Sequence, residues 1–175
     1  MGADGLFAVL LAVIVLERLA ELVVSARYVA AAKRAGAVER GFGHYPVMVA
    51  LHVGLPAGAA SEVYLLDRPF LPWLGWPALV LVVVANALRW WCIRTLGAQW
   101  STRVLVIPQA ALVHSGPYRR FRHPNYVAVA VEGLALPLVH TAWLTALLFT
   151  AGNAVLLWIR IRCEEAALEE LAAAS

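Results

Sequence analysis

The chain has 175 residues, of which 62% are hydrophobic and only 14% are charged. A soluble globular protein is about half apolar and a quarter charged, and here the apolar residues form long uninterrupted runs that are typical of segments in lipid. This composition excludes an ordinary cytosolic enzyme. The net charge of +3 does not favour nucleic-acid binding, because the arginines stand mostly at the ends of apolar runs, where membrane topology explains them.

The first apolar run extends from Gly5 to Val24. A helix needs about 20 mainly apolar residues to cross the hydrocarbon layer of a bilayer, so this run is long enough. Asp4 stands where a signal peptide carries a basic residue, and no small-residue cleavage site follows, so we expect a retained membrane anchor. Because ionisable groups are costly in lipid unless paired, we expect Glu17, Arg18 and Glu21 to pair with arginine-rich loops at the interface. A role in substrate binding is the alternative.

Two further runs, Pro46 to Leu66 and Phe70 to Leu88, also have the length of a membrane-spanning helix. The run from Phe70 to Leu88 carries Trp73 and Trp76 at its start, and Trp90 and Trp91 follow its end. Tryptophans at both ends of a run are typical of interfacial anchors. His44 and His52 lie at the start of the first of these runs and inside it. We expect both histidines to be interfacial or helix-packing residues and not ligands.

The last apolar block, Tyr126 to Ile159, is too long for one span. Pro137 and the polar residues His140 and Thr141 predict a turn inside it, which makes residues 126–159 a helical hairpin with a short first helix. The predicted fold is therefore an all-α integral membrane protein with about five transmembrane helices. Residues 1–92 hold the first three, and residues 93–175 hold a cytoplasmic catalytic loop, the hairpin and a C-terminal helix.

Basic residues in short loops favour the cytoplasmic side of a membrane. The loop after the first run holds four of them, the second loop holds only Arg68, and residues 89–122 hold six arginines. The tail begins with Arg160 and Arg162. We therefore expect the N-terminus outside a bacterial inner membrane, with the first loop, the third connection and the C-terminal tail in the cytoplasm.

The third connection ends in the sequence GPYRRFRHPNY, residues 116–126. A membrane anchor with interfacial aromatic residues would explain its charge, but such an anchor needs neither a histidine nor two prolines that fix the backbone. Arginine offers a planar fork to a carboxylate, histidine exchanges a proton near neutral pH, and tyrosine faces stabilise a cation. The segment therefore predicts a functional site.

A second polar group, RIRCEEAAL at residues 160–168, follows the last apolar run. A helix end with an i,i+4 pair of Arg160 and Glu164 is the simpler interpretation of this segment alone. On the predicted topology, however, it emerges on the same side as residues 116–126. We therefore expect the two segments to form one polar pocket at the membrane surface.

Together the two segments resemble the catalytic half of the isoprenylcysteine carboxyl methyltransferase family, over about residues 97–171. The resemblance depends on Arg-His-Pro-x-Tyr followed by Arg-Ile-x-x-Glu-Glu-x-x-Leu. Members are integral membrane enzymes that use S-adenosylmethionine. The resemblance implies that Tyr118, His123, Tyr126, Glu164 and Glu165 contact this cofactor. An arginine could hold the cofactor carboxylate; Arg160 is expected among the cofactor-binding residues, and which arginine binds the carboxylate stays open. Ala128, Gln109 and Ala110 depart from the family's usual glycine and histidine positions, which bears on the substrate more than on the cofactor.

Residues 97–108, GAQWSTRVLVIP, together with HPNY at 123–126, are similar to a bacterial branch of this family. That branch methylates hydroxyls of long-chain alkylpyrones or phenolic lipids. The acceptor is therefore expected to be lipophilic, either a prenylcysteine-like carboxylate or such a hydroxyl.

A carboxylate acceptor is already ionised and needs only an arginine such as Arg119 or Arg122 to orient it. A phenol or enol benefits from a base, for which His123 is the first choice. Trp100 is a candidate wall of the substrate site. Glu132, about two helical turns beyond Tyr126, either faces this site or bonds to another helix.

Two other interpretations, a metal site and a non-enzymatic protein, are less favoured. A metal site is not expected, because His114, His123, Cys92 and Cys163 match no recognised ligand spacing. A small transporter or scaffold is the alternative function, although the absence of a duplicated half makes a transporter less attractive. The expected partners are the bilayer and a lipophilic or prenylated substrate, with no nucleic acid and an open oligomeric state.

Overall fold

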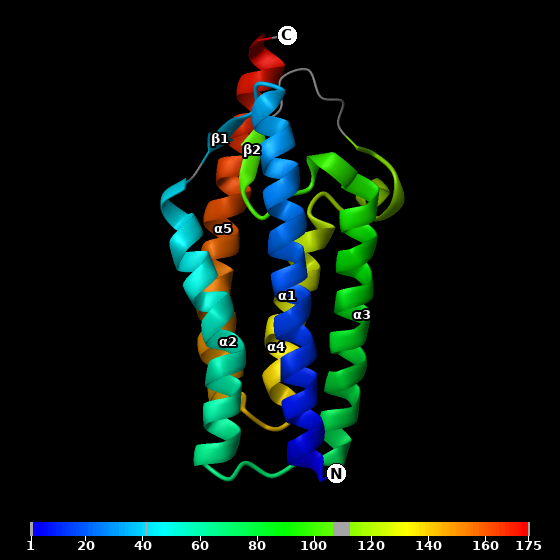
Figure 1. Cartoon of the computed structure of the whole chain (residues 1–175), viewed down its shortest axis with the longest axis vertical. Helices are drawn as coiled ribbons and strands as arrows, with labels where there is room; N and C mark the ends of the chain where they lie inside the picture. Colours follow the sequence, from blue (N-terminus) through cyan, green and yellow to red (C-terminus); the bar gives the residue numbers. More distant parts are fainter. Residues whose placement is uncertain (1, 41, 107–112, 175) are drawn as a thin grey trace.

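The computed structural model describes residues 2–40, 42–106 and 113–174 and contains five long or medium α-helices that stand side by side in one bundle (Figure 1). The helices are α1 (Ala3–Arg34), α2 (Tyr45–Leu65), α3 (Pro72–Leu96), α4 (Pro124–Leu138) and α5 (Trp143–Ala174). Short elements lie between them: the strands β1 (Val38–Arg40) and β2 (Val104–Val106), and the 3-10 turns η1 (Phe42–His44), η2 (Gly97–Gln99) and η3 (Gly116–Arg119). The predicted all-α fold is confirmed, and a helix covers each predicted segment.

Three of the described helices are long and apolar enough to cross a membrane: Tyr45–Leu65, Pro72–Gln99 and Trp143–Ala167. The other two differ from them in opposite ways. Helix α1 has 32 residues but carries three ionisable side chains near its middle, and α4 has only 15 residues, about 22 Å of helix. The chain is therefore an all-helical membrane protein, and the crossing of α1 and α4 stays a prediction.

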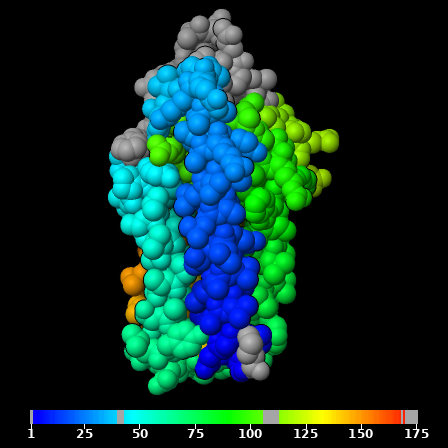
Figure 2. Space-filling model, in the orientation of Figure 1, coloured from blue at the N-terminus to red at the C-terminus, as the bar shows by residue number. Residues whose placement is uncertain are grey.

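The outer surface of the bundle is apolar. Helix α1 runs along the middle of one face, flanked by α2 and α3 (Figure 2), and it exposes Leu6, Leu16 and Leu19, with Leu16 65% exposed. Such large outward apolar surfaces are unfavourable in water and mark contact with lipid or a partner. Together with the helix lengths, they indicate that a bilayer covers the bundle.

The apolar core lies toward the end of the bundle that holds the N-terminus (Figure 1). All five helices contribute to it, for example Phe7 of α1, Ala59 of α2, Val82 of α3 and Leu136 of α4. Helices α4 and α5 approach closely because Gly133 leaves room for the ring of Phe149, which a Cβ at this position would overlap.

The predicted turn near Pro137 is confirmed, since α4 ends at Leu138 and α5 begins at Trp143. A carboxylate of α2, that of Glu62, caps the N-terminus of α5. Glu62 accepts hydrogen bonds from the backbone N–H of Leu144 at 3.1 Å and of Thr145 at 2.7 Å, and from the Thr145 hydroxyl at 2.8 Å. A carboxylate at a helix N-terminus satisfies unpaired N–H groups and interacts favourably with the helix dipole. Glu62 therefore fastens α2 to α5.

At the opposite end of the bundle, β1 and β2 form an antiparallel pair in which Glu39 stands opposite Leu105. This pair joins the connection after α1 to the connection after α3. The carboxylate of Glu39 forms ion pairs with Lys33 Nζ at 2.9 Å and with Arg103 Nη1 at 2.8 Å. Burial alone would raise the pKa of Glu39, but the hydrogen bonds from Lys33 and Arg103 outweigh it and hold the pKa below its ordinary value.

Replacing Glu62 with alanine is expected to lower the free energy of unfolding by about 2 kcal/mol, because several hydrogen bonds to one carboxylate are lost. The measurement is the thermal unfolding midpoint of the purified protein in detergent. Glu169→Gln, an exposed change on α5, is the matched control and should leave the midpoint unchanged. Equal midpoints for Glu62→Ala and Glu169→Gln would contradict this role of Glu62.

Glu39 makes stability depend on pH. Because its pKa is depressed in the folded protein, its contribution is fully present above the pKa of the unfolded carboxyl and is lost as pH falls through the folded-state value. We expect wild type to unfold at a higher temperature than Glu39→Gln at neutral pH. This difference should begin to shrink near the ordinary glutamate pKa of about 4.3 and vanish only below the depressed folded-state pKa. A difference that stays constant from pH 7 to the acid range would be evidence against the ion pairs.

Candidate active site

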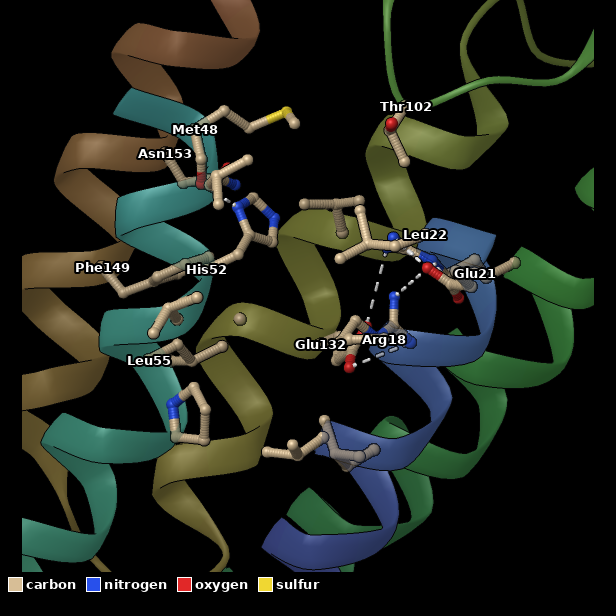
Figure 3. A pocket seen from close by; sticks show the side chains of 18 of the residues that line it. Arg18, Glu21, Leu22, Met48, His52, Leu55, Thr102, Glu132, Phe149 and Asn153 are labelled. Atoms are coloured by element: carbon tan, nitrogen blue, oxygen red, sulfur yellow. Dashed lines mark hydrogen bonds and ion pairs between the residues drawn. The ribbon is translucent and has the colours of Figure 1, made fainter. Parts of the chain in front are cut away.

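A cavity of about 580 Å³ lies between α1 and α2, with α4 behind it (Figure 3). Its lining extends from Ala8 and Tyr64, near the N-terminal end of the bundle, to Tyr126 and Arg160 near the other end. Leucine, valine, isoleucine and alanine make up 15 of the 32 lining residues. The volume is that of a small-molecule site, and the apolar lining suits a hydrocarbon chain.

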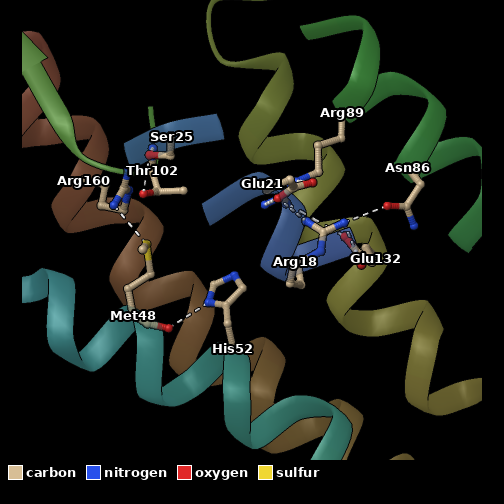
Figure 4. A network of polar contacts seen from close by, with 10 residues as sticks. All are labelled: Arg18, Glu21, Ser25, Met48, His52, Asn86, Arg89, Thr102, Glu132 and Arg160. Carbon is tan, nitrogen blue, oxygen red and sulfur yellow. Dashed lines mark hydrogen bonds and ion pairs between the residues drawn. The ribbon is translucent and has the colours of Figure 1, made fainter. Parts of the chain in front are cut away.

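Charged side chains from three helices form a buried charge cluster in one wall of this cavity (Figure 4). Glu21 accepts hydrogen bonds from Arg89 Nε at 2.8 Å and Arg89 Nη2 at 2.7 Å, and from Arg18 Nη1 at 2.9 Å. Arg18 Nη2 donates to Asn86 Oδ1 at 2.7 Å. Glu132 lies 3.4 Å from Arg18 and 3.9 Å from Arg89. The two guanidinium groups are thus matched by two carboxylates.

This arrangement bears out only part of one expectation from the sequence. Glu21 pairs with Arg89, the first arginine of the basic stretch 89–122, but Arg89 lies on α3 inside the bundle, and Arg18 bonds to Asn86 of α3 and Glu132 of α4. The reason is geometric, because positions three apart on a helix share a face, and this face of α1 turns inward. Glu132 lines the cavity and also forms ion pairs with other helices, and its role in substrate binding stays a prediction.

The two sequence motifs meet at the end of the cavity next to the C-terminal part of α5. Tyr126 donates its hydroxyl to Glu164 Oε2 at 2.8 Å. The ring of His123 stacks on Tyr126, with ring centroids 5.4 Å apart and planes at 15°. His123 Nδ1 is 3.8 Å from Glu164 Oε2, and its Nε2 is 3.7 Å from Glu165 Oε1. The structure therefore brings together His123, Tyr126, Glu164 and Glu165.

We call His123, Tyr126, Glu164 and Glu165 the motif site. Arg160 connects the motif site to the cavity. Its guanidinium carbon lies 5.7 Å from the ring centre of Tyr126, and its Nη1 lies 3.0 Å from Met48 Sδ of α2. The side chain is buried and lines the cavity. Arg160 is therefore a cation placed where the motif site and the apolar cavity join.

Tyr118 is held beside this site by η3. Gly116 has φ +55°, and a Cβ there would lie 2.8 Å from Thr95 Oγ1 of α3, so glycine allows η3 to pack against α3. Burial raises the pKa of Tyr118 far above its ordinary value, and the neighbouring Cys92 and Glu164 raise it further. The phenol stays protonated at any working pH, which makes it a wall or a donor and not a base.

The remaining sequence candidates separate into buried and exposed groups. Trp100 is buried and lines the cavity, and its Nε1 has no hydrogen-bond partner among the described residues. Arg119 is exposed, and Arg122 has 83% of its side chain exposed, 3.8 Å from Glu165. Neither arginine is among the residues that line the cavity. Gln109 and Ala110 lie outside the described residues.

The sequence motifs do not reveal the contribution of α2 to the site. Met48 and His52 line the cavity from this helix (Figure 3), although we expected His52 to be a packing residue. The available signal was their spacing, since residues four apart lie on one helix face. Within the described part of the chain, no group of three or more His, Cys, Asp and Glu side chains is placed to hold a metal ion.

Comparisons with known proteins identify the family of this chain. Residues 78–170 match the isoprenylcysteine carboxyl methyltransferase (ICMT) family. Over 166 residues the chain is 40% identical to the uncharacterized protein YpbQ of Bacillus subtilis (strain 168), which covers 94% of this chain and 98% of that protein. It is 26% identical over 166 residues to an uncharacterized protein of Haemophilus influenzae, covering 94% of each. The chain therefore belongs to the isoprenylcysteine carboxyl methyltransferase family.

Proposed function

We propose that this protein is a membrane-embedded, S-adenosylmethionine-dependent O-methyltransferase that acts on a lipophilic acceptor. One observation carries the proposal: the apolar cavity between α1 and α2 ends at Tyr126 and Arg160, which are joined to the motif residues His123 and Glu164. A lipid-like molecule in the cavity therefore has one end beside the motif site. Membership of the family supports methyl transfer as the reaction class.

The residues of the motif site fit the polar part of S-adenosylmethionine. Its amino acid portion carries an ammonium, which the carboxylates of Glu164 and Glu165 match, and a carboxylate, which Arg160 matches. Two buried polar atoms here, His123 Nε2 and Asn125 Oδ1, have no hydrogen-bond partner among the described residues. Unpartnered buried polar atoms are costly, and a polar ligand would satisfy them.

S-adenosylmethionine, when bound, supplies a methyl group that is electrophilic because it is attached to a positively charged sulfur. The protein then has to align the acceptor with this methyl group and exclude competing water. The apolar part of the cavity lining favours a hydrocarbon chain over water. Tyr118 and Tyr126 offer aromatic walls. Arg160 would hold the carboxylate of S-adenosylmethionine, and Glu164 and Glu165 would hold its ammonium.

The acceptor oxygen belongs either to a prenylcysteine-like carboxylate or to a hydroxyl of an alkylpyrone or phenolic lipid. A carboxylate would need a cation at the cavity. Among the arginines that line it, Arg18 and Arg89 are already matched by Glu21 and Glu132, and Arg160 is assigned to the donor. Arg160 is therefore favoured over the exposed Arg119 and Arg122 as the cation of this site. Because Arg160 is assigned to the methyl donor, the cavity leaves no unmatched arginine for a carboxylate acceptor, which favours a hydroxyl acceptor.

We further propose that the end of the bundle with β1, β2 and the C-terminus faces the cytoplasm of a bacterial cell, with the N-terminus outside the inner membrane. The basic side chains of Lys33, Arg34 and Arg103 lie at that end, as the distribution of basic residues across membranes requires. The cofactor would then enter from the cytoplasm and the acceptor from the bilayer.

Calorimetric titration of S-adenosylmethionine into the detergent-purified protein tests this proposal. We expect binding by wild type and at least a tenfold weaker affinity for Glu165→Gln, because a charge-assisted hydrogen bond to the ammonium is lost. Glu169→Gln, one turn further along α5 and exposed, should bind like wild type.

A folded wild-type protein that binds neither S-adenosylmethionine nor S-adenosylhomocysteine, with or without a lipid acceptor, would overturn the proposed function. It would favour a transporter or scaffold instead. Equal affinities of Glu165→Gln and Glu169→Gln would place the cofactor elsewhere.

A further inference from the structure

We propose that His52 of α2 is the general base of this reaction and takes the proton from a hydroxyl acceptor bound between α1 and α2. This inference rests on the proposed function. It adds a residue outside the matched segment 78–170, and it commits the acceptor to a hydroxyl.

The hydrogen bond of His52 determines which ring nitrogen is available. His52 Nδ1 lies 2.8 Å from the backbone carbonyl oxygen of Met48. A carbonyl oxygen only accepts hydrogen bonds, so Nδ1 carries the hydrogen and donates it. In the neutral ring the lone pair is then on Nε2. Among the described residues none forms a hydrogen bond with Nε2, and the ring lines the cavity (Figure 3).

The ring of His52 is held in place by its neighbours. Phe149 of α5 contacts it edge-on, with centroids 5.5 Å apart and planes at 83°, and the Met48 carbonyl fixes its rotation. Met48 lies one turn away on α2, and its sulfur is 3.0 Å from Arg160 Nη1. His52 is therefore connected, through Met48 and Arg160, to the end of the cavity where the motif site begins.

The wall opposite His52 is polar and carries no net charge. The ring points toward Arg18 across the cavity (Figure 4), and the buried charge cluster contains two arginines and two glutamates. The charged and titratable side chains that line the cavity with His52 are Arg18 and Glu21 of α1, Tyr64 of α2, Arg89 of α3, Tyr126 and Glu132 of α4, and Arg160 of α5. Such a wall suits a neutral head group that accepts and donates hydrogen bonds, since Arg160, the remaining cation of the lining, is assigned to the methyl donor.

The proton and electron changes balance as follows. The hydroxyl proton passes to His52 Nε2, the oxygen forms a bond to the methyl carbon of a sulfonium donor, and the carbon–sulfur bond breaks with its electron pair on sulfur. The products are a methyl ether, a neutral thioether and an imidazolium, which releases its proton to solvent. His52 thus supplies the base that a hydroxyl acceptor needs.

This assignment gives His123 a different role from the one expected from the sequence. His123 is not among the residues that line the cavity, and its two ring nitrogens face Glu164 and Glu165. It is therefore a positioning residue at the cofactor end. Its loss should weaken S-adenosylmethionine binding, whereas loss of His52 should not.

The experiment compares two acceptors of different acidity with the full-length protein in detergent. Para-nonylphenol needs a base, and its ortho-nitro derivative is already ionised at mildly alkaline pH. We expect His52→Gln to lose at least about a hundredfold in kcat with para-nonylphenol but only a few-fold with the nitro derivative. His114→Gln, which removes an exposed histidine, should match wild type with both acceptors.

A measurement without cofactor separates proton transfer from activity. The visible absorbance of the bound nitrophenol reports its ionised fraction, and its titration midpoint should lie at lower pH in wild type than in His52→Gln. Calorimetry should give equal S-adenosylmethionine affinities for the two proteins.

Equal kcat losses of His52→Gln with both acceptors, or equal titration midpoints, would overturn the role of His52. Cofactor binding by wild type without methylation of either phenol would also overturn it while leaving the methyltransferase proposal intact. Absence of cofactor binding by folded wild type is the distinct result that removes the proposed function itself.

Discussion

The bidentate pair of Glu21 and Arg89 is the interaction on which the site depends. It holds α1 against α3, and Arg18 and Glu132 extend the same contact to α4. Helix α2 is fastened elsewhere, because Glu62 caps the start of α5. Helices α1 and α2 meet near the N-terminal end of the bundle, where the Tyr64 hydroxyl donates to the backbone carbonyl of Asp4 at 2.9 Å. An apolar cavity lies between the same two helices.

Burying charged groups is costly, and a buried ion pair is weak evidence for stability. In a membrane, paired ionisable groups of this kind mark a functional site more often than a structural one. Here the charges form one wall of the cavity, and His52 forms the other. The same side chains therefore position α1 and present hydrogen-bonding groups to the cavity.

Much of the bundle could be predicted from the sequence, because long apolar runs and the turn near Pro137 are local signals. The proximity of the motif residues was also accessible, since Tyr126 and Glu164 lie on helices joined by a short turn. The inward direction of Arg89 was not, because a charge at the end of an apolar run is explained equally well by the interface. It points inward because Glu21, 68 positions away, accepts its hydrogen bonds.

The pairing of β1 with β2 and the role of α2 were missed for related reasons. Strands of three residues carry little periodicity, and the pairing of Glu39 with Arg103 depends on contact between two distant connections. His52 belongs to no motif, and its spacing from Met48 acquires meaning only when the cavity is known. The exposure of Arg119 and Arg122 likewise depends on how η3 packs against α3.

In the proposed function the cavity between α1 and α2 holds the hydrocarbon chain of the acceptor. The most direct test compares kcat/KM for para-nonylphenol and para-cresol in wild type and in Ala60→Phe, which fills the cavity from α2 at a distance from the motif site. The cavity predicts a strong preference of wild type for the long chain, a much smaller preference in Ala60→Phe, and unchanged S-adenosylmethionine affinity. An equal preference in both proteins would contradict the claim.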